Sequence, residues 1–207
     1  MVHINRKDFF IKIFFAAIII AIMGFGFDKF ELENRAFATI IAIDESDEGL
    51  LVSLLIADTK KFAQPTAEEA EYKKTQSAKN LNTAINELDK SLPNKLYFGH
   101  LKAIVLSNEV LNNHDLLISI LAELLTHREI NIKTLILKPE DGTKAEKILE
   151  IKPTEHKLLG IQLSTLYSSI NSLDLEELWL YANEHSCIKR FQVLIPTIPS
   201  TDNTKIR

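Results

Sequence analysis

The segment from Phe9 to Phe27 constrains this chain more than any other part of its sequence. It contains nineteen residues, of which only Lys12, near its start, is charged. A helix of that length spans about 29 Å, which matches the ~30 Å hydrocarbon core of a bilayer. Lys12 lies within one turn of the helix end, so its long side chain can reach the interface. The segment therefore predicts one membrane-spanning helix, and no later stretch approaches its length and apolarity.

Charged residues on either side of this segment predict its orientation. Arg6 and Lys7 precede the apolar run, whereas Asp28, Glu31 and Glu33 follow it. Cytoplasmic flanks of membrane helices carry an excess of Lys and Arg. We therefore expect the N-terminus to lie in the cytoplasm and the chain after residue 28 to lie outside the membrane.

A cleaved signal peptide is the alternative interpretation of residues 1–27. Signal peptides normally have a shorter apolar region, followed by small residues at an Ala-x-Ala-like cleavage site. Gly24 and Gly26 are small, but aromatic residues flank both of them. This favours a retained membrane anchor, and both interpretations export the remainder of the chain.

The charge balance of the exported part argues against nucleic-acid binding. The whole chain has a formal charge of −4, and residues 1–27 contribute three cations and one acid, so the remainder carries −6. Binding to phosphate backbones depends on clustered Lys and Arg. The single cysteine, Cys187, can form neither an internal disulfide nor a thiolate cluster for a metal. We therefore expect a body that folds on its hydrophobic core alone.

Alternating apolar and polar runs predict an α/β (α+β) domain with a mixed central sheet and flanking helices. The apolar runs Ala36–Ile43 and Leu50–Ala57, separated by Asp44–Gly49, predict a β-hairpin with a polar loop. Both runs are apolar on both alternating sets of positions, so each strand should be covered on both faces. Residues 58–76 are polar and predict a long exposed connection.

The rest of the body predicts further helices and strands. Helices are expected at Ser77–Leu92, Asp115–Leu125, Thr143–Ile151, Leu158–Ile170 and Asp174–Glu184, and strands at Leu101–Leu106, Ile132–Leu137 and Phe191–Ile195. Asp174 and Glu177 have the spacing of a capping box, which would start the last helix.

Motifs for phosphate binding and hydrolysis are missing from the sequence. Its six glycines form neither a P-loop nor a dinucleotide fingerprint, and no Gly-x-Ser-x-Gly occurs. The six histidines show no metal-ligand spacing, and His185-x-Cys187 alone is a weak signal. We therefore expect no enzyme activity, no metal and no cofactor. An exported hydrolase and a generic extracytoplasmic binding module stay open as alternatives.

Residues 95–107 contain the most specific motif in the chain. Their sequence, KLYFGHLKAIVLS, places Gly99, His100 and Lys102 directly before an apolar strand. This arrangement resembles the aromatic-Gly-His-Leu-Lys motif of the Ger(x)C family, the C subunits of nutrient receptors in spore germination. Other parts of the chain resemble the family in the same order, namely the strand ending at Ile43-Asp44, the helix at Ser77–Leu92, the turn at Arg128-Glu129-Ile130 and the sequence VLIPTI at 193–198.

The resemblance divides the chain into an N-terminal anchor or signal segment at 1–27, a Ger(x)C N-terminal-like domain at 28–198 and a tail at 199–207. Family members usually carry a lipobox cysteine ahead of the domain. Gly26 stands at that position, so lipidation cannot occur there. The tail lies where the family's second, C-terminal domain would begin, and a truncated product, a fragment and a one-domain variant all fit the sequence.

The resemblance implies a non-catalytic subunit of a nutrient germinant receptor, acting in receptor assembly or signal relay. It implies multi-pass A- and B-type subunits as partners and a place on the outer face of the spore inner membrane. The candidate structural or interaction residues are Gly99, His100, Lys102, Arg128 and Asp44. For Gly99 and His100 we expect a structural role, because glycine allows a close backbone approach or a positive φ and histidine can bridge two backbone groups.

Overall fold

The computed structural model describes residues 35–58, 70–153, 158–168, 172–184 and 194–199. The predicted membrane segment Phe9–Phe27, the lipobox position Gly26 and the pair His185 and Cys187 lie outside these ranges. Within them, no helix has the length and apolarity needed to cross a bilayer. The described residues from Arg35 onward belong to one compact unit.

Strands β1 (Arg35–Ser46) and β2 (Gly49–Ala57) form the predicted antiparallel hairpin. Its loop is shorter than expected, because both strands extend until only a two-residue turn, Asp47–Glu48, remains between them. Gly49 follows this turn with a φ of 126°, and a Cβ at this position would lie 2.8 Å from the carbonyl oxygen of Ala78. Glycine is required here because it adopts positive φ freely and has no Cβ to collide.

The sheet is mixed, as predicted. Its described strands run in the order β3-β2-β1-β5-β6-β7, and β4 (Lys95–Tyr97) also pairs with β1. β5 (Ala103–Leu106), β6 (Leu135–Pro139) and β7 (Thr197–Ile198) are parallel to their neighbours, whereas β2 is antiparallel to both of its neighbours. The late strand therefore begins at Thr197, after the range in which it was predicted, and residues 191–193 lie outside the described ranges.

The polar segment after the hairpin is a strand over part of its length. β3 (Glu71–Ala78) pairs with β2 over eight residues in antiparallel register. The prediction of an exposed connection is therefore wrong for residues 71–76. β3 lies at the end of the strand order, where polar side chains suit an edge strand and discourage pairing with other chains. The Lys73 ammonium also reaches the Glu146 carboxylate at 2.8 Å, which ties this edge to α6.

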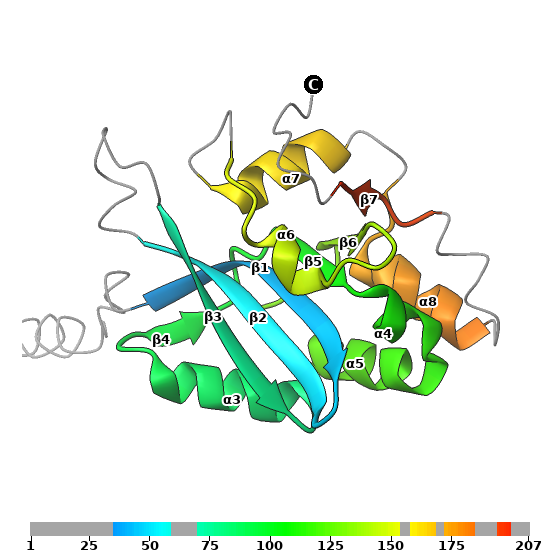
Figure 1. Ribbon diagram of the computed structural model, residues 1–207, viewed down its shortest axis with the longest axis horizontal. Helices are drawn as coiled ribbons and strands as arrows, with labels where there is room; N and C mark the ends of the chain where they lie inside the picture. Colours follow the sequence, from blue (N-terminus) through cyan, green and yellow to red (C-terminus); the bar gives the residue numbers. More distant parts are fainter. Residues whose placement is uncertain (1–34, 59–69, 154–157, 169–171, 185–193, 200–207) are drawn as a thin grey trace, which may run out of the picture. The chain divides into compact units, whose positions relative to one another are not determined.

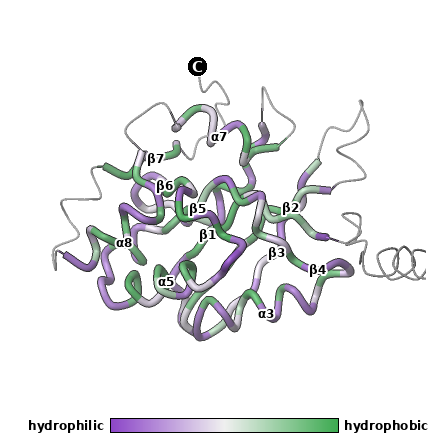
Figure 2. The backbone as a smooth tube through the Cα atoms, turned by 180° about the vertical axis from the view of Figure 1, so that it is seen from behind, coloured by the Kyte–Doolittle hydropathy of each residue, from purple (hydrophilic) through white to green (hydrophobic). Residues whose placement is uncertain are grey.

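Helices cover both faces of the sheet (Figure 1). α3 (Leu81–Ser91), α4 (Asn108–Asn112), α5 (His114–Thr126) and α8 (Leu175–Glu184) lie on one face, and α6 (Ala145–Ile148) and α7 (Leu159–Tyr167) lie on the other. Figure 2 shows hydrophilic and hydrophobic residues alternating along α3, as expected for a helix that covers a core. The predicted flanking helices are confirmed, although α6 covers only Ala145–Ile148 of the predicted Thr143–Ile151, and the single turn α4 is an addition to them.

Local hydrogen bonds set where two of these helices begin. The Asn80 side chain accepts a hydrogen bond from the Thr83 N–H at 2.8 Å, so α3 begins at Leu81 rather than at Ser77. At the start of α8, Asp174 accepts from the Glu177 N–H at 2.9 Å, and Glu177 accepts from the Asp174 N–H at 3.3 Å. This reciprocal pair confirms the predicted capping box.

A β-bulge at Thr39 changes which residues of β1 face each layer. Ala38 pairs with Ile56 and Ile40 pairs with Leu55, so Thr39 has no opposite residue on β2. The side chains in the core beneath α3 and α5 are Ala36, Ala38, Ile41 and Ile43, and those in the core beneath α6 and α7 are Ile40 and Ala42. One extra residue thus shifts the alternation by one position. Both faces of β1 are buried, as its apolar sequence predicted.

Candidate functional site

The sheet is irregular on both sides of Thr39. On one side is the bulge against β2. On the other, Phe37 pairs with Tyr97 of β4 and Ile40 pairs with Ala103 of β5, so two residues of β1 face five residues of the connecting chain. Residues 98–102 therefore leave the plane of the sheet between β4 and β5. Such irregularities often lie beside functional sites, because they redirect side chains and open space between strands.

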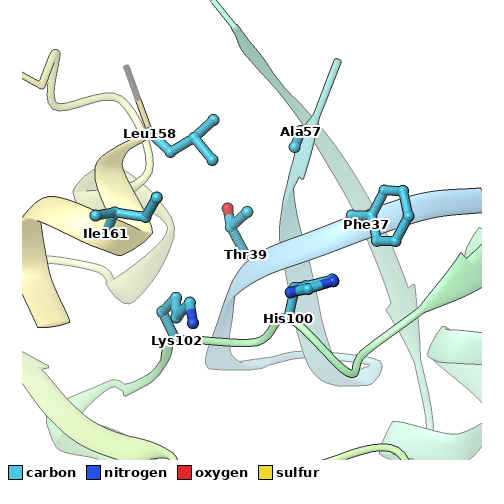
Figure 3. Close-up of a pocket in the computed structure, with 7 residues that line it drawn as sticks. All are labelled: Phe37, Thr39, Ala57, His100, Lys102, Leu158 and Ile161. Carbon is cyan, nitrogen blue, oxygen red and sulfur yellow. The ribbon is translucent and has the colours of Figure 1, made fainter. Parts of the chain in front are cut away.

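A pocket of about 230 Å³ lies at this irregularity. Its lining comes from β1, β2, the connection between β4 and β5, and the start of α7, and consists of Phe37, Thr39, Ala57, His100, Lys102, Leu158 and Ile161. Figure 3 shows the other side chains arranged around Thr39, with Leu158 and Ile161 of the α7 region on one side and Phe37 on the opposite side. His100 and Lys102, from the Gly-His-Leu-Lys motif, complete the lining.

Backbone hydrogen bonds hold the motif segment against the sheet. The Lys102 N–H donates to the Thr39 carbonyl oxygen at 2.8 Å, and the Leu101 N–H donates to the Phe98 carbonyl oxygen at 2.9 Å. The side chains of Phe98 and Leu101 are buried in the core, whereas those of His100 and Lys102 are exposed. The motif therefore alternates between residues that anchor it and residues that it presents at the pocket.

His100 belongs to a cluster of rings, and Gly99 lies against one of these rings. The His100 ring lies 5.3 Å from the Phe37 ring and 6.1 Å from the Tyr97 ring, and Arg35 stacks over Tyr97 at 4.4 Å. A Cβ on Gly99 would overlap the Tyr97 ring, so glycine serves the close approach that the sequence predicted as one possibility. The other possibility, a positive φ at Gly99, is wrong, because the described glycines with a positive φ are Gly49 and Gly142. The contacts of the exposed His100 side chain are with rings, and the predicted bridge between two backbone groups is not found in the described part of the chain.

Thr39, which lines the pocket, forms a polar contact with the half-buried Glu71. The Thr39 hydroxyl donates to Glu71 Oε1 at 2.6 Å, and the Leu159 N–H at the start of α7 donates to Glu71 Oε2 at 2.7 Å. Burial raises the pKa of the Glu71 carboxyl, and the hydrogen bonds from Thr39, Leu159 and Gly160 oppose that rise. Sequence reasoning missed Glu71, because one acid among Glu68, Glu69 and other charged residues of a polar segment carries no local signal of burial.

Asp44 occupies a similar position elsewhere on the same face of the sheet. The prediction that it lies in the hairpin loop is wrong, since it is a residue of β1 and is only 2% exposed. Its carboxylate accepts hydrogen bonds from the Ala145 N–H at 2.7 Å and the Glu146 N–H at 2.9 Å. Burial raises the pKa of this carboxyl, and those two hydrogen bonds oppose the rise. Asp44 therefore fixes the start of α6 and does not line the pocket.

Arg128 also lies outside the pocket lining. It is an exposed residue of the turn that follows α5, as the sequence predicted. Its neighbour Glu129 accepts a hydrogen bond from the Phe98 N–H at 3.2 Å, so this turn and the motif segment are joined. Of the five candidate residues, the structure brings His100 and Lys102 to the pocket, with Gly99 beside them.

The arrangement is suited to binding an apolar group beside a cation. Among the seven lining residues, Lys102 carries the one permanent charge, and the Thr39 hydroxyl is engaged by Glu71. No group of three or more His, Cys, Asp or Glu side chains placed to hold a metal ion occurs among the described residues. The lining thus offers shape, apolar surface and one positive charge.

Comparison with known proteins identifies the family. The family model described as the spore germination protein N-terminal domain matches residues 28–183, about three quarters of the chain. Neither the curated proteins nor the solved structures gave a match. The matched range runs from β1 into α8, with the pocket and the Gly-His-Leu-Lys motif inside it, and confirms the resemblance drawn from the sequence. The chain therefore belongs to the family of spore germination proteins that share this N-terminal domain.

Proposed function

We propose that this chain is a non-catalytic, membrane-anchored subunit of a nutrient germinant receptor, acting in receptor assembly or signal relay. The observation that carries the proposal is the family match over residues 28–183, since it gives the chain a role in spore germination. The absence of a P-loop, a dinucleotide fingerprint and a nucleophile elbow from the sequence supports a subunit that binds rather than catalyses.

The anchor in this proposal is the apolar segment Phe9–Phe27. Since Gly26 replaces the lipobox cysteine, a lipid cannot hold the protein to the membrane at that position. A single spanning helix binds a membrane essentially irreversibly, whereas one acyl chain gives only reversible binding. The body then lies on the outer face of the spore inner membrane, with Arg6 and Lys7 on the cytoplasmic side.

Reporter fusions test this topology. Alkaline phosphatase fused after residue 60 should be active, and a cytoplasmic fluorophore fused at the same place should be dark. The fusion protein should sediment with membranes and keep residues 1–27. A mature N-terminus near residue 25, with protein released into the medium, would instead identify a cleaved signal peptide.

The partners in this proposal are multi-pass A- and B-type receptor subunits. Crosslinking and affinity purification of the tagged full chain from spore membranes should recover both. A matched strain in which residues 1–27 are replaced by a cleavable signal peptide is the control, because it exports the same body without the anchor. If both partners are recovered with the full chain and neither with the control, their association depends on the membrane anchor.

Deletion of the gene tests the role itself. Spores of the deletion strain should respond slowly to particular nutrients while vegetative growth stays normal, and the full chain supplied in trans should restore the response. Normal germination with every nutrient, together with no membrane partner in the crosslinked sample, would contradict receptor membership. That outcome would favour a generic extracytoplasmic binding module.

A further inference from the structure

We propose that the pocket around Thr39 binds a small organic acid with an apolar ring or branched chain and a single carboxylate. This inference concerns the pocket alone and holds whether or not the chain assembles with a receptor. It rests on the size of the pocket, on its apolar walls and on the single cation in its lining (Figure 3).

Size sets the first limit on the ligand. The pocket volume of about 230 Å³ lies below the range of roughly 300–1,000 Å³ for drug-sized ligands. It lies above the ~150 Å³ apolar cavity that admits benzene in another protein. One aromatic ring or a short branched chain therefore fits, whereas a nucleotide or an extended peptide does not.

The walls determine where the apolar part of the ligand lies. Phe37, Ala57, Leu158 and Ile161 surround the space on three sides, and Thr39 contributes its methyl group as well as its hydroxyl. The Thr39 hydroxyl donates to Glu71 and is not free to donate to a ligand. An apolar group placed here displaces water from apolar surface, which is favourable in proportion to the area covered.

The single cation determines the charge of the ligand. In the part of the chain that the structure describes, no salt bridge engages the Lys102 ammonium, although Lys73, Lys133 and Lys147 each pair with an acid. A carboxylate beside Lys102 would gain a charge-assisted hydrogen bond. His100 lies at the same side of the pocket. Its ring nitrogens add a second hydrogen-bonding group beside Lys102, which donates or accepts according to the tautomer.

The lining also excludes a free amino acid as the preferred ligand. None of the seven lining residues is acidic, so an α-ammonium group would have no carboxylate partner and would face Lys102. Glu71 does not line the pocket, and both of its carboxylate oxygens already accept hydrogen bonds from Thr39 and Leu159. The pocket thus favours a simple acid over the corresponding amino acid.

Three compounds of one shape test this charge preference. 3-Phenylpropionate carries only the carboxylate, phenylalanine adds an α-ammonium group, and 3-phenylpropanamide replaces the carboxylate with a neutral amide. Binding is measured by calorimetric titration of the purified full chain in a mild neutral detergent, with detergent alone as the blank. We expect saturable binding of the acid, with phenylalanine and the amide each at least about fivefold weaker.

Variants assign the binding to the pocket. Lys102→Gln should weaken binding of the acid about five- to tenfold and leave the amide unchanged. Lys90→Gln, which removes an exposed lysine at the end of α3, is the matched control and should change neither. Ala57→Phe should fill the pocket and abolish binding of both compounds, while circular dichroism and the unfolding temperature show that the chain still folds.

Several outcomes would overturn the proposal. These are no saturable binding of the acid, equal binding of the acid and the amide, and an equal loss in the Lys102→Gln and Lys90→Gln variants. A tetrapeptide that ends in phenylalanine with a free carboxylate is the last comparison. Tighter binding of the peptide than of 3-phenylpropionate would assign the site to a protein C-terminus instead of a small acid.

Discussion

The Thr39 hydroxyl donates to the Glu71 carboxylate at 2.6 Å, which joins the bulge of β1 to the first residue of the edge strand β3. The same carboxylate accepts the Leu159 N–H, so the contact also fixes the start of α7. Three segments that are far apart in the sequence therefore meet at one half-buried acid next to a residue that lines the pocket.

Thr39→Val removes the hydroxyl while keeping the shape of the side chain. We expect the unfolding free energy to fall by about 1–3 kcal/mol, because the half-buried Glu71 carboxylate loses a hydrogen-bond donor. Urea unfolding followed by circular dichroism measures this change. Thr165→Val, at an exposed position of α7, is the control and should change stability by no more than about 0.5 kcal/mol. An equal effect of the two substitutions would contradict a special role for the Thr39 hydroxyl.

Gly99→Ala should destabilise the chain only while the Tyr97 ring is present. The added Cβ displaces that ring from its contacts with Phe37 and Arg35. A double-mutant cycle with Tyr97→Ala should therefore give a coupling free energy of about 0.5–2 kcal/mol. If Gly99→Ala costs the same with and without the Tyr97 ring, the close approach is not the reason for glycine at this position.

Asp44→Ala should lower the stability of the chain more than the loss of an acid from an exposed loop would. It leaves the N–H groups of Ala145 and Glu146 without their acceptor, which should lower the unfolding free energy by about 2–4 kcal/mol. Asp44→Asn keeps one acceptor oxygen and should cost less. Asp141→Asn, at an exposed position, controls for the loss of a carboxylate. Equal stability of Asp44→Ala and the wild type in thermal unfolding would refute the capping role.

Glu71 should make stability depend on pH in a defined direction. Its pKa in the folded chain is raised above the ordinary 4.5 because burial disfavours the charged form. Between pH 4.5 and the raised pKa, Glu71 is therefore protonated in a larger fraction of folded chains than of unfolded chains. Its contribution to stability falls as pH rises through this interval.

Replacing Glu71 by glutamine removes this dependence. We expect the unfolding free energy of Glu71→Gln to improve relative to that of the wild type as pH rises from about 4 to about 7. Glu48→Gln, in the exposed hairpin turn, is the matched control for removing one carboxylate. A relative improvement of the variant toward low pH instead would show that the hydrogen bonds to Glu71 outweigh its burial.

The sequence alone predicted the features that depend on neighbours along the chain. The hairpin of β1 and β2 follows from two apolar runs and a polar turn, and the α8 capping box follows from the spacing of Asp174 and Glu177. The Gly-His-Leu-Lys motif identified the family, because it is a short run of residues whose order is specific. In each case the information lies within a single continuous stretch, the longest being the hairpin at residues 35–57.

Only the tertiary structure decided the features that depend on distant partners. β3 is polar and becomes a strand because β2 offers it an edge to pair with. Asp44 is buried because α6, about a hundred residues later, places two N–H groups against it. The pocket forms because a bulge at Thr39, an excursion around His100 and the start of α7 near Leu158 meet in space. Local sequence patterns indicate the secondary-structure preference of a segment and which of its faces is apolar. The hydrogen-bond partner of a buried polar group depends instead on which distant group the fold places beside it.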